Sequence, residues 1–322
     1  MSKIKAGIIG GAGYTGGELI RLLLNHPSVE IGFIHSKSYS GKKVYEVHTD
    51  LYQETDLNFV EQIDFNVDVI FLCVAHGEAT DFLQKHQLNG AIKVIDLSQD
   101  FRIKGDHQFV YGLPELQRDK ISSADHVANP GCFATCIQLA LLPLAKTNNL
   151  ADEVHVSAIT GSTGAGFSPS PTTHFSWRNN NISVYKAFDH QHLKEITQSI
   201  RQLAPGYDRN INFIPFRGNF SRGILASVYI NWEGSEQEAL EMYQKYYQDH
   251  PFVHVSPINP DLKQVVNTNK CILHLEKHAD KLLIISAIDN LLKGASGQAV
   301  QNMNLMFGLD EISGLQLKPV AF

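Results

Sequence analysis

Cys132 lies where a helix is expected to begin, directly after a tight turn. Pro130 and Gly131 interrupt the preceding segment, and the apolar run from 135 to 146 has helical spacing. Unpaired backbone N–H groups and the helix dipole favour a thiolate there by roughly 0.3–1 kcal/mol. Lowering a thiol pKa by about two units takes roughly 2.7 kcal/mol, so a reactive thiol needs a second partner, such as a histidine. The alternative is that Cys132, like most cysteines, is a small buried apolar residue.

Glycines at a spacing of Gly-x-x-Gly-x-x-Gly form a second group with possible chemistry. Gly10, Gly13 and Gly16 follow a short apolar segment and open an expected helix. Glycine is needed where the backbone turns sharply and where a pyrophosphate approaches a helix N-terminus without meeting a Cβ atom. The turn, with Tyr14 and Thr15, predicts a dinucleotide site. The alternative is a tight strand-to-helix turn without a ligand.

The residues after the second expected strand predict which nicotinamide cofactor binds. In NAD-preferring folds, a carboxylate at this position contacts the ribose 2′-hydroxyl. The chain instead has Ser36 and Lys37, a hydroxyl and a cation with no carboxylate beside them. These groups suit a 2′-phosphate, so we expect NADP. The alternative is that Lys37 is a solvated loop lysine.

The elements that must position the glycine turn alternate between strands and helices. The expected elements are strands at 5–10, 29–35, 67–75 and 91–97, and helices at 17–25 and 77–87. Strand, helix and strand within about thirty residues imply a parallel sheet with right-handed crossovers. We therefore expect a Rossmann-type α/β domain over residues 1–130, completed by a C-terminal helix at about 294–322.

The pattern changes after about residue 150. The expected elements are longer strands at 154–159, 224–232, 271–276 and 281–287, and helices at 189–203 and 235–248. Several of these strands alternate in polarity, which is typical of a sheet with one covered face. We expect an α+β domain with a mixed or antiparallel sheet over residues 131–293, carrying the substrate site, the catalytic groups and the oligomer contacts.

The composition excludes several classes of partner. The chain has 322 residues, a formal net charge of -6, 43% hydrophobic residues and 19% charged residues, values typical of a globular protein of two domains. The acidic balance disfavours nucleic-acid and anionic-membrane partners, and no apolar stretch approaches the ~20 residues of a membrane helix. The four cysteines lack disulfide or zinc spacing. We expect no metal, a cytoplasmic location, and small molecules or further copies of the chain as partners.

Nine segments, in order along essentially the whole chain, match the motifs of one enzyme family. They are residues 10–16, 73–77, 96–102, 110–115, 129–135, 161–166, 190–195, 221–224 and 289–295. With these the chain resembles the N-acetyl-gamma-glutamyl-phosphate reductases of arginine biosynthesis, relatives of the aspartate-semialdehyde dehydrogenases. Two positions depart from the family pattern: Cys136 stands where Gly or Ala is usual, and Lys194 stands where Pro usually precedes Glu195. Neither removes a reacting group, but Cys136 leaves open which thiol reacts.

The resemblance implies reduction at the acyl level through a covalent intermediate. Cys132 would attack the γ-acyl phosphate, release phosphate and leave a thioester. NADPH would deliver hydride, and the thiohemiacetal would collapse to the semialdehyde. His190 is the expected general acid/base, His192 is the alternative, and Glu195 would orient one of them. Without the cysteine and the resemblance, the two histidines would be ordinary surface residues at a helix start.

Anion-binding side chains are also implied, because the substrate carries a phosphate and an α-carboxylate. Arg102 is expected at the phosphate together with Ser98 and Asn129, and Arg222 at the carboxylate. Either arginine could instead form an ion pair within the protein.

Two further segments are implied at the nicotinamide. Residues 161–166, with Ser162 and Gly164, would pass near the ring, and Asn290 would hydrogen-bond its carboxamide. The sequence does not give the oligomeric state, but an exposed sheet in the second domain would favour a homodimer or homotetramer.

Several functions remain open from the sequence. The acyl group on glutamate is acetyl or a larger group such as succinyl. A close rival is the same chemistry on aspartyl or aminoadipyl phosphate. A non-catalytic NADP-binding sensor would keep the fold with an unreactive Cys132, and a dehydrogenase acting on a 2-hydroxy acid would leave that cysteine idle.

Overall fold

The chain forms two compact units, each built on its own seven-stranded sheet. The computed structural model describes residues 2–88 and 90–321. The first unit runs from the N-terminus to Pro130 and adds Ala295–Gln316. The second runs from Gly131 to Gly294 and adds the segment from Leu317 onward. No helix within the described residues is long and apolar enough to cross a membrane.

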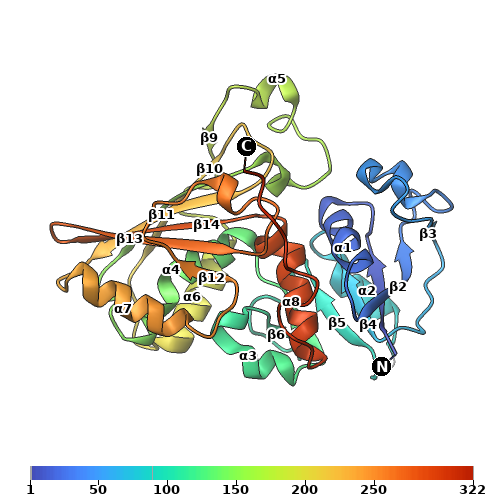
Figure 1. Cartoon of the computed structure of the whole chain (residues 1–322), viewed down its shortest axis with the longest axis horizontal. Helices are drawn as coiled ribbons and strands as arrows, with labels where there is room; N and C mark the ends of the chain where they lie inside the picture. The colour runs from blue at the N-terminus through green and yellow to red at the C-terminus, as the bar shows by residue number, and fades with distance from the viewer. Residues whose placement is uncertain (1, 89, 322) are drawn as a thin grey trace. The chain divides into compact units, whose positions relative to one another are not determined.

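The sheet of the first unit is parallel throughout, with strand order β3-β2-β1-β4-β5-β7-β6 (Figure 1). Its strands are β1 (Ile4–Ile9), β2 (Val29–His35), β3 (Phe59–Val60), β4 (Val69–Leu72), β5 (Lys93–Asp96), β6 (Val110–Tyr111) and β7 (His126–Ala128). Strand β4 is buried along its whole length, as expected for a parallel strand covered on both faces. The Rossmann-type α/β class predicted from the sequence is confirmed.

Within the described residues, four helices belong to this first unit. They are α1 (Tyr14–Leu24), α2 (Glu78–Lys85), α3 (Pro114–Ser122) and α8 (Gly297–Met306), accompanied by the short turns η1 (Val44–Glu46) and η2 (Thr49–Leu51). Helix α8 follows a π-helical turn, η5 (Leu292–Ser296), and packs against α1, α3 and β5. Nearly all residues of α8 are buried, so the end of the chain supplies core to the unit in which the chain begins.

The sheet of the second unit is mixed, with strand order β12-β13-β14-β11-β8-β10-β9 (Figure 1). Its strands are β8 (Val154–Thr160), β9 (Ser183–Val184), β10 (Ile211–Arg217), β11 (Ile224–Asn231), β12 (Val253–Val255), β13 (Cys271–His278) and β14 (Lys281–Ile288). The β8/β10 and β12/β13 pairs are parallel, and the remaining pairs are antiparallel. The α+β class with a mixed sheet is therefore also confirmed.

Helices cover one face of this second sheet. They are α4 (Cys132–Lys146), α6 (His192–Leu203) and α7 (Glu236–Tyr247), which lie together below the sheet in Figure 1, and a short helix α5 (Phe175–Arg178) lies in the connection between β8 and β9. The turns η3 (Ser162–Ala165) and η4 (Leu262–Gln264) complete the unit. Helix α4 is buried from Phe133 to Ala145, because it packs on β11, β13 and β14 and between α6 and α7. An almost wholly apolar helix is stable only in such a central position.

Strand β10 was not expected from the sequence. Pro215, which has no backbone N–H, lies within it, and proline within a strand usually argues against a central position. The strand nevertheless pairs with β8 along its full length and with the short β9 on its other side. Its register places Arg217 opposite Thr160, at the carboxyl ends of both strands.

Candidate active site

The glycine turn of the first unit has the geometry that a dinucleotide requires. Gly10 has φ +80°, and a Cβ atom there would lie 2.4 Å from the carbonyl oxygen of Cys73. A Cβ atom at Gly16 would lie 2.6 Å from the Cα atom of Gly11. At Gly13 the space is open, since the nearest atom to a Cβ would be 3.9 Å away. Glycine is therefore required sterically at 10 and 16, whereas at 13 it leaves room for an approaching group.

The turn also leaves the start of α1 uncapped. Gly13 is the N-cap residue and has no side chain with which to cap the first turn. Those N–H groups and the positive end of the helix dipole are suited to a pyrophosphate. His48, which the sequence gave no reason to select, supports the turn through a 2.8 Å hydrogen bond between Nε2 and the Gly11 carbonyl. The residues present therefore fit a dinucleotide.

Tyr14, Thr15, Ser36 and Lys37 lie around this turn in different ways. Tyr14 is exposed, and the Thr15 side chain hydrogen-bonds the Cys73 thiol. Ser36 is buried and its N–H donates to the Val60 carbonyl, whereas Lys37 is exposed directly after β2. A lysine that keeps its ammonium in solvent at this position can reach a 2′-phosphate without a desolvation cost.

Ser98, Arg102 and Asn129 gather around the end of β5, where most of their polar atoms bond to the protein itself. The Ser98 hydroxyl donates to the Asp96 carboxylate at 2.9 Å. Arg102 Nε donates to the Asn129 carbonyl at 2.9 Å, and its Nη2 to the Leu97 carbonyl at 3.0 Å. Burial raises the pKa of Asp96 to about 6, although Ser98 and Arg102 lower it. Arg102 thus connects the backbone after β5 to the backbone after β7.

Asn129 is still more firmly held. Its Nδ2 donates to the Ala295 carbonyl at 3.0 Å, and its Oδ1 accepts from Asn302 Nδ2 at 3.1 Å. The residue is 1% exposed. These bonds tie the end of β7 to α8 and to the π-helical turn before it, a connection between distant segments that the sequence did not predict.

Cys132 is the first residue of α4 in the second unit, as the sequence predicted. Its N-cap residue Gly131 has an extended backbone and no side-chain cap, so the thiol lies at the positive end of the dipole. Gly294 packs directly against it: a Cβ atom there would lie 2.8 Å from Cys132 Cβ and 3.2 Å from its Cα. Any side chain at 294 would displace the cysteine.

Glu195 fixes the turn that carries Cys132. Its Oε2 accepts a 2.9 Å hydrogen bond from the backbone N–H of Gly131, and both groups are buried. Its Oε1 lies 3.9 Å from Nε2 of His192 one turn earlier on α6. Beside the expected role of orienting a histidine, Glu195 therefore has a second one, holding the N-cap residue before Cys132.

His190 sits among aromatic rings beside α4. Its ring centroid lies 5.5 Å from Phe133, 5.4 Å from Phe213 and 4.6 Å from His192. Burial, followed by the positive charges of Lys186 and Arg217, lowers the pKa of His190 to about 4. Its Nδ1 accepts from the backbone N–H of His192 at 3.2 Å, which assigns the proton of the neutral ring to Nε2.

Tyr185 and Arg217 complete this group, and the sequence analysis missed both. The Tyr185 ring lies 5.8 Å from His190, and the Arg217 guanidinium lies 4.7 Å from the centroid of the same tyrosine ring. Burial, together with the negative charge of a Cys132 thiolate, raises the pKa of Tyr185 to about 12. The phenol is therefore protonated and within electrostatic reach of Cys132. No local motif marks either residue, because the strand that carries Arg217 was itself unpredicted.

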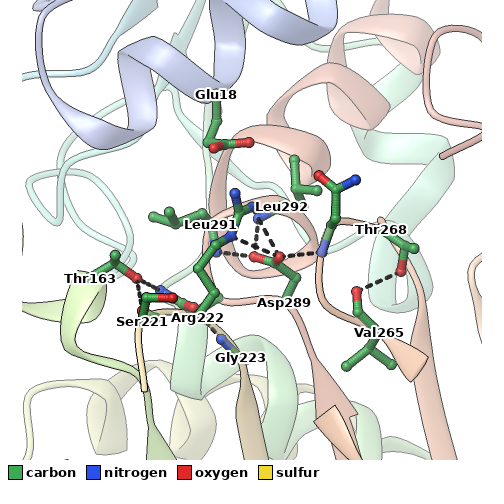
Figure 2. Close-up of polar contacts among 12 residues, drawn as sticks. Glu18, Thr163, Ser221, Arg222, Gly223, Val265, Thr268, Asp289, Leu291 and Leu292 are labelled. Atoms are coloured by element: carbon green, nitrogen blue, oxygen red, sulfur yellow. Dashed lines mark hydrogen bonds and ion pairs between the residues drawn. The ribbon is translucent and has the colours of Figure 1, made fainter. Parts of the chain in front are cut away.

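Arg222 lies against a buried carboxylate (Figure 2). Asp289 Oδ2 accepts from Arg222 Nε at 3.1 Å and lies 2.9 Å from its Nη2, and it also accepts from the Asn267 N–H at 2.7 Å. Asp289 Oδ1 accepts from the N–H groups of Leu291 and Leu292. The arginine that the family likeness places at the substrate carboxylate is thus also the partner of a fully buried acid.

Asn290 links the segment 161–166 to the β10–β11 connection. Its Nδ2 donates to Thr163 Oγ1 at 3.0 Å, and its Oδ1 accepts from the Gly223 N–H at 2.7 Å. Ser162 N–H donates to the Phe220 carbonyl at 2.8 Å. A Cβ atom at Gly164 would lie 3.2 Å from the Thr160 hydroxyl. The residues expected near the nicotinamide therefore form one hydrogen-bonded group.

Cys136 differs sharply from Cys132. It is fully buried, and its Sγ lies 3.3 Å from both the carbonyl and the hydroxyl oxygen of Ser286. Burial raises the pKa of Cys136 well above its usual value. Because the thiolate is the nucleophile, Cys132, which is only half-buried, is the cysteine suited to react.

Comparison with known domain families assigns a class to these two units. The model described as semialdehyde dehydrogenase, NAD binding domain, matches residues 5–124. The model described as semialdehyde dehydrogenase, dimerisation domain, matches residues 132–290. Solved structures agree at the level of the fold: aspartate semialdehyde dehydrogenase II from Vibrio cholerae has a TM-score of 0.75 at 16% identity, over 95% of this chain and 99% of that one. The protein is an oxidoreductase of the semialdehyde dehydrogenase class.

Curated relatives narrow the class to one family. N-acetyl-gamma-glutamyl-phosphate reductase of Bacteroides thetaiotaomicron is 62% identical over 99% of this chain and 100% of the relative. The reductase of the same name from Flavobacterium johnsoniae is 53% identical, again over 99% and 100%. The chain belongs to the N-acetyl-gamma-glutamyl-phosphate reductase family, which confirms the resemblance recognised from its motifs.

Proposed function

We propose that the protein reduces an N-acyl-glutamyl 5-phosphate to the 5-semialdehyde and phosphate, with NADPH, in arginine biosynthesis. The observation that carries the proposal is the position of Cys132. It opens a buried helix, it lies against a glycine that leaves it room, and it occurs in a chain 62% identical to a relative named for this reaction.

The thiol chemistry follows from that position. The Cys132 sulfur attacks the γ-acyl carbon, the carbon–sulfur bond forms, and the carbon–oxygen bond to phosphate breaks, so that phosphate leaves. The uncapped N–H groups at the start of α4 stabilise the thiolate before attack. After the acyl group has been reduced, the carbon–sulfur bond breaks, the aldehyde is released and the thiolate returns.

Proton movement is assigned to the histidine pair. His192 Nε2 lies 3.9 Å from Glu195 Oε1, so the carboxylate can orient this ring, and we assign the proton transfer to His192. From the sequence, His190 was the expected general acid/base. Its low pKa and its Nδ1 contact instead suit a neutral ring that donates through Nε2, and we assign it a hydrogen bond to the acyl oxygen.

The glycine turn and the end of β2 would hold the cofactor. Gly10, Gly13 and Gly16 would admit the pyrophosphate to the start of α1, and Lys37 would contact the 2′-phosphate. When bound, NADPH supplies the hydride. The segment with Ser162 and Gly164, and Asn290 beside it, remain the proposed nicotinamide contacts.

The substrate anions keep the partners proposed for them. Arg102, with Ser98 and Asn129, is assigned the phosphate, and Arg222 the carboxylate end. Both arginines also bond to protein groups, so substrate contacts through them would use their remaining hydrogen-bonding capacity.

A homodimer or homotetramer in the cytoplasm is part of the proposal. The match of the second unit to a dimerisation domain supports oligomer formation. The sheet face opposite α4 supports it too, because it presents half-buried apolar residues such as Ile159, Ile214 and Leu225. Light scattering during size-exclusion chromatography tests this part: a monomer at micromolar concentration would contradict it.

The reverse reaction tests the function directly. Purified protein is given NADP, inorganic phosphate and one semialdehyde, and NADPH formation is followed by absorbance. We expect turnover with N-acetyl- or N-succinyl-glutamate semialdehyde, and both are assayed side by side because the acyl group is open. A higher kcat/KM with aspartate or aminoadipate semialdehyde would overturn the substrate assignment.

A second measurement addresses the non-catalytic alternative. The rate of Cys132 alkylation by iodoacetamide, followed against pH, reports the thiol pKa. NADP binding combined with an ordinary thiol pKa and no turnover would indicate a sensor instead of an enzyme.

A further inference from the structure

Arg217 has an unused hydrogen-bond donor next to Tyr185. Its Nε is buried and has no hydrogen-bond partner. Among the described residues no acidic side chain pairs with its guanidinium. Leaving a buried charged donor unmet costs free energy, and such a cost is expected where a ligand supplies the missing acceptor.

Thr160 presents a second unmet group at the same level of the sheet. Its Cα is the direct partner of Arg217 across the parallel β8/β10 pair. The side chain is 1% exposed, and its hydroxyl forms no hydrogen bond within the described residues. Side chains alternate between the two faces along a strand. Thr160 therefore shares a face with Val156 and Ala158 on β8, and Arg217 shares that face with Phe213 on β10. All three of these apolar residues are buried beneath the helices. A hydroxyl and a guanidinium N–H at neighbouring positions are together suited to an oxyanion.

Contacts around Arg217 connect this pair to the reacting residues. The guanidinium lies 4.7 Å from the ring centroid of Tyr185, and that ring lies 5.8 Å from His190. Lys186, the other cation that acts on His190, already donates to Gln191 Oε1 at 3.2 Å. Arg217 is therefore the cation of this group whose donor remains available.

A neighbouring arginine shows what a structural role looks like. Arg178 Nη1 donates to the Arg217 carbonyl at 2.6 Å, and its other N–H groups donate to Thr172, Asn181 and Ser183. Arg178 is satisfied by oxygen atoms of the protein and fixes the end of β10. Burial, followed by the positive charge of Arg217, lowers the pKa of Arg178. The two cations are therefore close enough to repel each other, and a bound anion would relieve that repulsion.

We propose that Arg217, with the Thr160 hydroxyl, binds an oxyanion of the substrate in the second unit. The inference rests on the proposed function and adds a substrate contact to it. Neither residue belongs to the motifs by which the family was recognised. The oxyanion has three possible sources in an acyl-glutamyl phosphate: the phosphoryl group, the α-carboxylate, and the terminal carboxylate of a succinyl group.

Kinetics of Arg217→Gln distinguish these sources. Loss of a charged hydrogen bond is expected to raise one KM by about 10- to 100-fold, with a smaller change in kcat. A raised KM for inorganic phosphate identifies the phosphoryl group. An equal rise for N-acetyl- and N-succinyl-glutamate semialdehyde identifies the α-carboxylate, and a rise for the succinyl compound alone identifies the acyl carboxylate.

Matched variants separate binding from folding. Arg217→Lys keeps the charge and should recover part of the affinity, and Thr160→Val, nearly the same in shape, should raise the same KM by a smaller factor. Arg209→Gln changes an exposed arginine of the same unit and should change nothing. Unchanged KM values in Arg217→Gln, or a fall in kcat alone with a lowered melting temperature, would overturn the proposal.

A readout without turnover makes this result independent of the proposed function. Inorganic phosphate and glutarate are tested for slowing the iodoacetamide alkylation of Cys132. Protection in the wild type that is lost in Arg217→Gln supports the oxyanion site even if no semialdehyde is turned over. Equal protection in both proteins, or none in either, would count against it.

Discussion

The two units differ in how they present the residues proposed to act. In the first, the glycine turn at 10–16 presents backbone N–H groups, and its side chains matter chiefly by being absent. In the second, Cys132 opens α4 beside a group of side chains from α6, β10 and the β9–α6 connection. A backbone site tolerates change except at glycine, whereas a side-chain site depends on each member. Substitutions in each unit should therefore show this difference between backbone and side-chain sites.

Replacing the nucleophile should have the largest effect. Cys132→Ser is expected to reduce turnover by about 1,000-fold or more, because a hydroxyl at this position is a far weaker nucleophile than a thiolate. Phosphate-dependent NADPH formation measures it. Cys136→Ser is the matched control and should retain activity, since that thiol is buried against Ser286. Near-normal turnover of the Cys132 variant would remove the proposed intermediate.

The two histidines should separate in their pH dependence. His192→Asn is expected to reduce kcat by about 100-fold or more and to change the shape of the pH–rate profile, because general acid–base groups typically contribute 10²–10⁴-fold. His190→Asn should lower kcat but keep the profile above pH 5, since a group whose pKa is about 4 stays neutral there. Loss of a limb above pH 5 in His190→Asn would reverse the assignment.

One added methyl group should damage the two units differently. Gly294→Ala places a Cβ atom 2.8 Å from Cys132 Cβ and is expected to lower kcat by about 10- to 100-fold through misplacement of the nucleophile. Gly16→Ala distorts the turn of the first unit and should mainly raise the KM for NADP. Gly206→Ala, where a Cβ meets nothing within 4 Å, is the control. If Gly294→Ala and Gly16→Ala changed kcat and the KM for NADP by the same factors, this difference between the two units would be contradicted.

Replacing Lys37, the residue proposed to contact the 2′-phosphate, should have a moderate effect. Lys37→Ala is expected to raise the KM for NADPH by about 10-fold, because a charged hydrogen bond to the 2′-phosphate is lost, and to leave the KM for NADH unchanged. Lys42→Ala, another exposed lysine of the same loop, should alter neither. An equal change for both cofactors would show that Lys37 does not read the 2′-phosphate.

The smallest effect concerns stability and His190. Its folded-state pKa of about 4 lies below the unfolded value of 6.5, so the unfolded chain binds more protons between these two pH values. The free energy of unfolding should therefore rise with pH from about 4 to 6.5 and gain nothing more from this group above that. His190→Asn should reduce this slope in urea melts. An unchanged slope would mean that His190 is not buried as a neutral ring.

Most of the framework could be predicted because it depends on local patterns. Strand β2 was expected at 29–35 and spans those residues, and α4, α7, β13 and β14 lie where their apolar spacing placed them. Strand β10 could not be predicted, because it contains Pro215 and depends on pairing with its neighbouring strands. The residue most affected is Arg217, which stands at the end of that strand.

What the sequence determined by itself is the chemistry available at short range: a glycine turn before a helix, a cysteine after another turn, and a set of motifs that identify a family. Such features depend on a few consecutive residues, whose steric and hydrogen-bonding demands are fixed locally. Tertiary structure decided which side chains meet. Strand register set Arg217 opposite Thr160, helix packing brought Glu195 to Gly131, and the fold paired Arg222 with Asp289. These contacts join residues far apart in the chain, so their free energy exists only once both partners are buried together.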